Sequence, residues 1–209
     1  LMSRADHVIC HHENDFYKYV KMMSNYKNGT KLYHIAHCAE QTVFRDYEEA
    51  KEYDLFLGGA TNGVSILGKH YPLRDRMVGI LGKMSKHYKC QLHRHPGYNL
   101  AAASSNKYAV DFAKEINKAK IAVTCSGKPK SRFGKYIEIP MCGTAIAADL
   151  PEEDQENFKK FMIEIDMSMT DEQIINKLSY YLDNDEERKK LISLGLEWSK
   201  NYTHEKYAE

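Results

Sequence analysis

The sequence predicts an α/β fold in which a doubly wound, mostly parallel sheet is flanked by helices, with further helices at the carboxyl end. Short apolar runs alternate along the chain with longer segments of helical periodicity. Strands that are separated by helices favour a parallel sheet covered on both faces. The 209 residues suffice for one full α/β domain and a little more.

The expected strands are short apolar runs that lie next to turns or glycines. Their ranges are 7–12, 31–40, 53–60, 88–95, 121–127 and 161–166, with another apolar run directly after Gly143. The run YDLFLGGA at 53–60 ends in two glycines before its last residue, which marks the start of a loop.

The expected helices are the amphipathic segments between these runs. They cover 15–27, 71–87, 105–120, 170–183 and most of 184–209, the last in two pieces with Gly195 between them. Pro72 suits the first turn of its helix, where an N–H is not needed. Thr170 is a cap residue, because a hydroxyl there accepts a bond from a free backbone N–H.

Composition excludes several classes of function. The net charge is only +1, so no basic field favours nucleic acid or an anionic membrane. The longest apolar runs are too short to span a bilayer, and the amino terminus lacks the pattern of a signal peptide. Five widely spaced cysteines suit reduced core thiols. We therefore expect a cytoplasmic protein without transmembrane segments.

A charged stretch at 45–54, RDYEEAKEYD, is poor in apolar residues and is typical of a domain boundary. We accordingly expect two units. Residues 1–46 form a remnant of another domain or an extension, and residues 47–209 form the main α/β domain with its carboxyl-terminal helices.

Ligands of such sheets bind where the strands end and helices begin. The loops expected to meet there are 58–70, 93–99, 125–135 and 149–154. The loop SGKPKSRFGK at 126–135 gathers the cations Lys128, Lys130, Arg132 and Lys135. Cations and a helix start both favour a phosphate group, and Gly134 lets the backbone approach it.

Glu138 lies three residues after Lys135, so both side chains share one face of a short helix. This helix must start near Tyr136, because a proline such as Pro140 is tolerated only near a helix start. A carboxylate in that first turn can accept hydrogen bonds from the two hydroxyls of a ribose. The residue types alone are equally compatible with a solvated basic loop that carries a surface ion pair.

The stretch KYIEIPMCGTAIAADLP at 135–151 resembles the nucleotide-sugar-binding segment of glycosyltransferases with the two-Rossmann-domain GT-B architecture. It is most similar to their family 1, family 4-like and spore-coat-related group, in which a cation, a Glu and a Gly-Thr pair recur in this order. The segments 53–59, 71–77 and 170–209 resemble the first strand, first helix and last helices of the donor-binding domain. The strands at 7–12 and 31–40 would then belong to the end of the acceptor-binding domain.

The resemblance implies transfer of a sugar from a nucleotide-diphosphate donor, of the UDP- or GDP-sugar type, to an acceptor hydroxyl. It implies no cofactor besides the donor, no metal, and no interaction with nucleic acid; the chain would carry mainly the donor-binding half and associate with the missing acceptor-domain part. The donor-binding residues would be Glu138, Lys135, Arg132, Gly134, Tyr136, Arg74, Gly58 and Thr144. One departure concerns the donor sugar: many members carry a Glu where this chain has Lys130.

Two other interpretations stay open. The first is a degenerate transferase domain that acts as a binding or assembly module. The second is a flavodoxin-like or response-regulator-like domain, although the acidic cluster this would need at strand ends is missing. His93 and His95 are a weak metal motif, and His11 and His12 are weak catalytic candidates. The acidic residues 152–154 are expected in a solvent-exposed turn. The catalytic residues and the acceptor are not identified.

Overall fold

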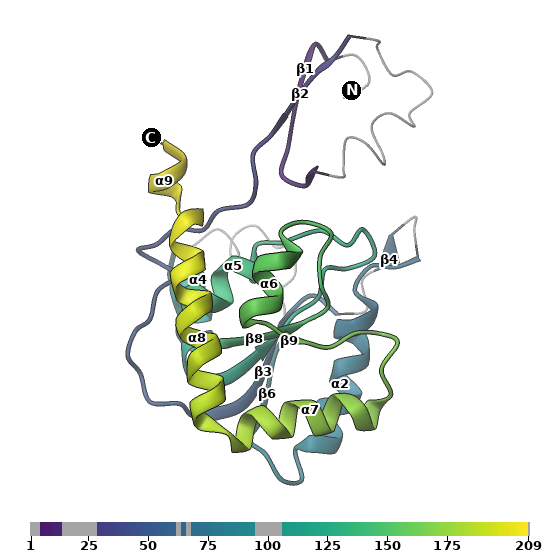
Figure 1. Ribbon diagram of the computed structural model, residues 1–209, viewed down its shortest axis with the longest axis vertical. Helices are drawn as coiled ribbons and strands as arrows, with labels where there is room; N and C mark the ends of the chain where they lie inside the picture. The colour runs from purple at the N-terminus through teal and green to yellow at the C-terminus, as the bar shows by residue number, and fades with distance from the viewer. Residues whose placement is uncertain (1–4, 14–28, 62–63, 66–67, 95–105, 209) are drawn as a thin grey trace.

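A five-stranded parallel sheet forms the centre of the molecule (Figure 1). The computed structural model describes residues 5–13, 29–61, 64–65, 68–94 and 106–208. The strands stand in the order β6-β3-β7-β8-β9, and every neighbouring pair is parallel. Their bounds are β3 Tyr53–Gly59, β6 Cys90–Arg94, β7 Ala119–Val123, β8 Ala145–Ala148 and β9 Ile163–Glu164. The expected sheet is thus confirmed.

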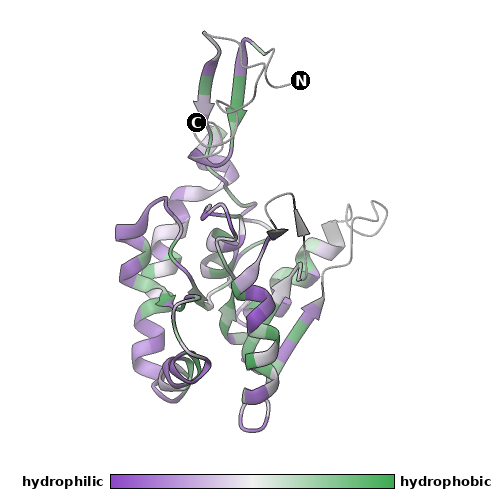
Figure 2. Ribbon diagram, turned by 90° about the vertical axis from the view of Figure 1, so that its right-hand side faces the viewer, coloured by the Kyte–Doolittle hydropathy of each residue, from purple (hydrophilic) through white to green (hydrophobic). Residues whose placement is uncertain are grey.

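Helices cover both faces of this sheet. On one face, α2 (Pro72–Met84) and α7 (Asp171–Asp183) pack against side chains such as Leu55 and Leu57. On the other face, Phe56 and its neighbours pack against α4 (Asn106–Asn117), α5 (Lys135–Met141) and α6 (Gln155–Phe161). Hydrophobic residues concentrate on the strands and on the inward faces of the helices (Figure 2). Successive side chains of β3 point to opposite faces, and helices cover both faces. The sequence of β3 therefore reads as a continuous apolar run.

The residues that the sequence analysis expected near helix starts lie there in the structure. Pro72 is the first residue of α2, and Thr170 forms a complete capping box with Gln173 at the start of α7. α5 begins at Lys135, so Pro140 is its sixth residue and Glu138 lies in its first turn. None of the helices among the described residues is both long enough and apolar enough to cross a membrane.

The carboxyl-terminal region differs from the expectation. α8 runs without a break from Asp185 to Ser199 and contains Gly195, followed by η3 (Lys200–Tyr202) and α9 (His204–Ala208). Gly195 does not separate two helices. A Cβ atom there would lie 3.0 Å from the Phe161 ring and 3.3 Å from Pro140 Cβ, so the glycine lets α8 pack closely on α6 and α5. The last expected strand, 161–166, is also shorter, because α6 extends to Phe161.

The amino-terminal segment forms a separate parallel pair of strands, β1 (His7–Cys10) and β2 (Lys31–His34) (Figure 1). β2 covers only the first part of the expected strand at 31–40. A further antiparallel pair, β4 (Val64–Ser65) and β5 (Gly68–Lys69), lies in the loop after β3. The helix expected at 15–27 lies wholly within 14–28, outside the described residues.

The stretch 39–51 has little regular structure but is held firmly on the main domain. Ala39 is 4% exposed and pairs with Thr203 beyond α8, and Phe44 packs on the core beside α5. The Asp46 carboxylate and the carbonyl of Cys142 both accept hydrogen bonds from Asn117 Nδ2, at 2.8 and 2.7 Å. These contacts cross the boundary expected at residue 46, and that boundary stays a prediction.

Asn117 is the main polar anchor of this stretch, because its fully buried amide also accepts a bond from the N–H of Glu49 at 3.2 Å. We expect Asn117→Ala to lower the free energy of unfolding by about 2–4 kcal/mol, since it leaves several buried groups without partners. Urea denaturation measures this. Asn201→Ala, which removes an exposed side chain with one bond to the Trp198 carbonyl, is the control and should change stability by less than about 0.5 kcal/mol. Equal effects would contradict the anchoring role.

A second prediction concerns the amino-terminal boundary. Residues 47–209 alone should fold, because both faces of the sheet are covered by helices within that range. Residues 39–209 should be more stable than 47–209 by roughly 2–4 kcal/mol, since they keep the buried contacts of Ala39 and Phe44. Thermal and urea unfolding of the two fragments test this. An unfolded 47–209 would mean that the earlier strands are needed for the main domain.

Candidate functional site

A cavity of about 230 Å³ lies at the carboxyl end of β3, beside the amino ends of α2 and α5. It is lined by His37, Gly59, Ala60, Tyr71, Arg74, Phe133, Gly134, Lys135 and Glu138. Loops from three different parts of the chain therefore meet at the carboxyl ends of the strands, where parallel α/β folds bind their ligands.

Arg74 brings a buried positive charge to this cavity. Its side chain rises from the first turn of α2 and is only 4% exposed. The guanidinium donates to the Ala60 carbonyl at 2.9 Å and to Thr124 Oγ1 at 3.3 Å, and it lies 4.2 Å from the centre of the Tyr71 ring. Its Nε is buried without a hydrogen-bond partner, and no carboxylate among the described residues pairs with it. A buried cation without an anion is costly, so the site suits an anionic ligand.

The first turn of α5 supplies a second cation and a carboxylate. Lys135 Nζ donates to Glu138 Oε2 at 2.8 Å, and both side chains keep a quarter or less of their surface exposed. The same ammonium group lies 4.2 Å from the centre of the Phe112 ring. Gly134 leaves room for this arrangement, because a Cβ there would lie 2.8 Å from Glu138 Oε1. Side-chain acceptor and donor groups thus face one small cavity.

Gly59 shapes the wall opposite α5. Its φ of +109° belongs to a region that side-chain-bearing residues rarely adopt, and a Cβ there would lie 3.1 Å from Arg74 Nη1. The glycine therefore permits both the turn after β3 and the close approach of the guanidinium to the backbone.

The loop that leads into α5 is held by the buried carboxylate of Asp149, at the end of β8. This carboxylate accepts bonds from the N–H and hydroxyl of Ser126, at 2.8 and 2.6 Å, and from Lys130 Nζ at 2.7 Å. Tyr136 OH donates to the Asp149 carbonyl at 2.6 Å. Burial and the adjacent Asp149 raise the pKa of the Tyr136 phenol far above its ordinary value, so the phenol remains a donor.

The structure brings half of the expected donor-binding residues together at the cavity. Arg74, Gly134, Lys135 and Glu138 all line it. Gly58 is adjacent in the chain to the lining residue Gly59, but a Cβ on Gly58 would meet the rings of Phe56 and Phe112 in the core.

The other three expected residues lie elsewhere. Tyr136 is completely buried under the loop, as described above. Thr144 directly precedes β8 and so lies at the amino ends of the strands, opposite the cavity. Its hydroxyl donates to the Ile116 carbonyl at 2.8 Å. Arg132 is 4% exposed and its guanidinium lies 4.3 Å from the centre of the Tyr202 ring. The geometry thus gives these side chains structural contacts and does not place them in the cavity.

The acidic turn at 152–154 is exposed only in part: Glu152 is exposed as expected, whereas Glu153 and Asp154 are not. Glu153 is 8% exposed, and its carboxylate accepts bonds from the N–H groups of Arg132 and Glu13, at 3.0 and 2.6 Å. Asp154 accepts bonds from Trp198 Nε1 at 2.8 Å and from Tyr202 OH at 3.2 Å. Segments from both ends of the chain therefore cover these carboxylates: Glu153 is bonded to Glu13 and to the loop before α5, and Asp154 to residues of α8 and η3.

The structure places no candidate metal cluster at the cavity. Among the described residues no group of three or more His, Cys, Asp and Glu side chains is arranged to hold an ion. The one Asp-x-Asp triplet of the sequence, 183–185, lies where α7 meets α8, and there Asp185 pairs with Arg188 while Asp183 accepts from Tyr88. His93 ends up beside the rings of Phe56 and Phe112, and His95 lies outside the described residues.

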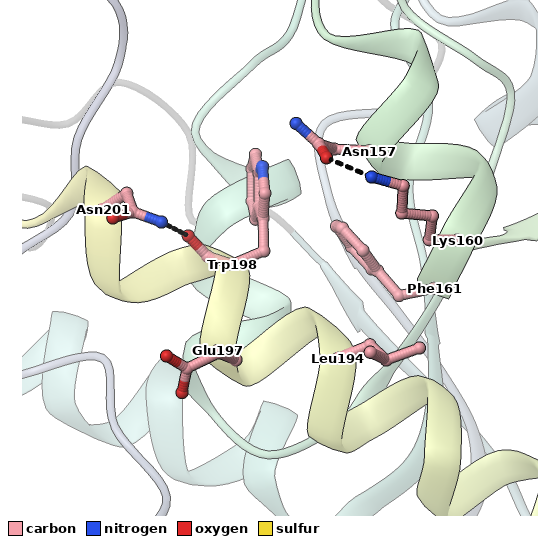
Figure 3. Close-up of a pocket in the computed structure, with 7 residues that line it drawn as sticks. All are labelled: Asn157, Lys160, Phe161, Leu194, Glu197, Trp198 and Asn201. Atoms are coloured by element: carbon pink, nitrogen blue, oxygen red, sulfur yellow. Dashed lines mark hydrogen bonds between the residues drawn. The ribbon is translucent and has the colours of Figure 1, made fainter.

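Another cavity, of about 300 Å³, lies between α6 and α8, on the far side of the acidic turn (Figure 3). Its floor is formed by Phe161, Leu194 and Trp198, and its rim carries amide and charged side chains, namely Asn157, Lys160, Glu197 and Asn201. The Trp198 ring already contacts the rings of Phe161 and Tyr202 in tilted arrangements, with centroid distances of 5.2 and 4.6 Å. This groove is therefore a packing seam between two helices rather than a site with converging polar groups.

Five residues that line the first cavity were not among the expected site residues: Gly59 and Ala60, which follow the expected Gly58, and His37, Tyr71 and Phe133. Tyr71 and Phe133 each stand directly beside an expected site residue or helix start, and an aromatic ring next to a buried arginine is a signal that could have found Tyr71. No local signal identifies His37, because only the tertiary structure brings the amino-terminal segment to the cavity.

No protein-family model matches the chain, and no curated protein matches it by sequence. Solved structures do match. Sucrose-phosphate synthase from Thermosynechococcus elongatus has a TM-score of 0.62 at 14% identity, over 98% of this chain and 56% of that chain. Anabaena HepE, in complex with UDP and glucose, has a TM-score of 0.65 at 8% identity, over 95% of this chain and 59% of that chain. The fold is that of GT-B glycosyltransferases.

A third match is to a carboxyl-terminal domain alone. The C-terminal domain of LpcC, a glycosyl transferase group 1 family protein from Francisella tularensis, has a TM-score of 0.54 at 13% identity. It matches 79% of this chain and 99% of its own length. The chain spans little more than half the length of the synthase and of HepE. It therefore corresponds in fold to about one half of the GT-B architecture, and the similarity is too distant to assign a subfamily.

Proposed function

We propose that the chain is the donor-binding half of a glycosyltransferase and that it binds a nucleotide-diphosphate sugar in the cavity beside α5. The observation that carries the proposal is the buried guanidinium of Arg74, which lines the cavity with an unpartnered Nε and, among the residues that the structure describes, without a carboxylate to balance its charge. A diphosphate offers the oxygens that such a cation lacks.

The roles of the other polar groups follow from their places around the cavity. Lys135 would offset charge on the diphosphate together with Arg74, which stabilises the leaving group when the sugar is transferred. Glu138 would accept hydrogen bonds from the ribose hydroxyls. α5 has only seven residues, so the proposal rests on these side chains rather than on a helix dipole.

The donor sugar would lie beyond the diphosphate, toward the acceptor half. Lys130 replaces the Glu found in many similar transferases and is bound to the buried Asp149, so it has a structural partner of its own. The group that activates the acceptor is not assigned to this chain. HepE is described with UDP and glucose, and an α-glucosyltransferase of the same fold with UDP-glucose, which makes UDP-sugars the first donors to test.

Glu138→Ala is expected to weaken binding of UDP or GDP by ~1.5–3 kcal/mol, because it removes a charged hydrogen-bond acceptor. Calorimetric titration measures this. The melting temperature of the ligand-free protein should hardly change, since a partly exposed ion pair contributes little. Glu156→Ala is a matched control: Glu156 also lies in the first turn of a seven-residue helix and pairs with a lysine three residues on, but far more exposed to solvent. Wild-type affinity in Glu138→Ala would refute the ribose assignment.

Nucleotide binding should survive an excess of chelator, because two cationic side chains face the cavity and no metal-binding cluster of described residues does. Binding should weaken as salt rises, since the contacts are ionic. Lys135→Ala should lower both the affinity, by ~1.5–3 kcal/mol, and the dependence on salt. Lys159→Ala, which breaks the matching exposed pair on α6, should change neither. Binding that is lost with chelator and restored by magnesium or manganese would overturn this proposal.

A further inference from the structure

His37 is the residue that the amino-terminal segment contributes to the cavity. It follows β2 and stands two residues before Ala39, whose N–H donates to the Tyr202 carbonyl at 2.9 Å. This anchor fixes the backbone close to His37. The imidazole lines the same cavity as Arg74, Lys135 and Glu138. A residue far from α5 in sequence is thus held against the proposed ligand site.

A stack of rings fixes the orientation of this imidazole. His11 lies 4.8 Å from it at an interplanar angle of 18°, and His12 lies 4.8 Å from it at 55°. His12 in turn meets the ring of Phe133, another lining residue, edge-on at 5.1 Å. His11 Nδ1 is hydrogen-bonded to the Ile35 carbonyl at 2.9 Å, which ties the stack to the backbone after β2.

The surroundings keep His37 neutral. Burial, followed by the neighbouring His12 and His11, lowers its pKa to about 4, and Arg132 acts in the same direction. Glu138 acts in the opposite direction and raises this pKa. Arg74 and Lys135 face the same cavity from α2 and α5. At neutral pH the ring therefore presents one N–H donor and one acceptor, without adding a positive charge to two cations already close together.

We propose that His37 is a further ligand-binding residue of the cavity and that its neutral imidazole donates a hydrogen bond to the diphosphate of the bound nucleotide sugar. The inference rests on the proposed function. A neutral donor fits here because the ligand-free cavity is rich in cations, whereas the bound state brings negative charge. His11 and His12 are positioning residues, since they contact the ring and not the cavity.

The contact has a consequence that can be measured. An anion beside His37 favours its charged form and therefore raises its pKa on binding. A pKa that rises on binding means that the complex takes up protons at a pH between the free and the bound values, so affinity increases as pH falls through that range. UDP-glucose is a suitable probe, because its diphosphate carries no proton that titrates there.

The first experiment is calorimetric titration of the whole chain with UDP-glucose, or with GDP-mannose if that binds more tightly. His37→Ala should weaken binding about three- to tenfold, and His37→Gln, which keeps an N–H donor, should restore part of the loss. Binding of the nucleoside alone should not change. His87→Gln, an exposed histidine between α2 and β6, is the control and should leave the affinity unchanged.

The second experiment separates contact with the ligand from a structural role. The His37 ring is titrated by NMR with and without the probe, and proton uptake on binding is measured in buffers of different ionisation enthalpy. A rise of the His37 pKa on binding, with proton uptake that disappears in His37→Gln, supports the inference. An unchanged His37 pKa, or His37→Ala binding within twofold of wild type, overturns it while leaving the proposed function intact. A wild-type chain that binds neither probe overturns both.

Discussion

The buried carboxylate of Asp149 is the contact on which the geometry of the candidate site depends. Asp149 directly follows β8. Its carboxylate accepts hydrogen bonds from the Ser126 N–H, the Ser126 hydroxyl and the Lys130 ammonium group, and its backbone carbonyl accepts one from the Tyr136 hydroxyl. These partners lie at both ends of the loop between β7 and α5. A buried carboxylate is stable only when its oxygens are fully hydrogen-bonded, so the loop has little freedom to move away. The first turn of α5, with Lys135 and Glu138, is therefore placed by a residue on a neighbouring strand.

A second constraint joins the two ends of the chain. Ala39 pairs with Thr203, and the Ala39 N–H and the Tyr202 carbonyl are bonded at 2.9 Å. Nearby, Glu153 accepts bonds from the N–H groups of Arg132 and Glu13. The amino-terminal segment, the loop before α5 and the helices after α8 thus meet above the same edge of the sheet (Figure 1). His37 from the amino-terminal segment thereby reaches the same cavity as Arg74, Lys135 and Glu138 of the main sheet.

The charges around that cavity are unequal in their environment. Arg74 is buried without a carboxylate partner among the described residues, whereas Lys135 is paired with Glu138 and about a quarter exposed. Arg132 is equally buried and its Nε also lacks a partner among the described residues, but it packs over the Tyr202 ring and does not line the cavity. Desolvating a guanidinium costs free energy that its two hydrogen bonds and its contact with Tyr71 offset only in part. An anionic ligand would offset this cost, and for this reason Arg74 is the strongest indication of a ligand site in the cavity.

The sequence by itself determined the features that depend on local patterns. Short apolar runs such as 53–59, separated by amphipathic segments, predicted the parallel sheet and its helices, and Thr170, Pro72 and Pro140 predicted where helices start and that Glu138 lies in a first turn. The tertiary structure alone decided which side chains share a space. It places Arg132, Tyr136 and Thr144 outside the cavity lining and His37 within it. It also buries Glu153 and continues α8 through Gly195. The physical reason is that hydrophobic periodicity and capping act within a few residues, whereas burial of a polar group depends on partners from distant segments.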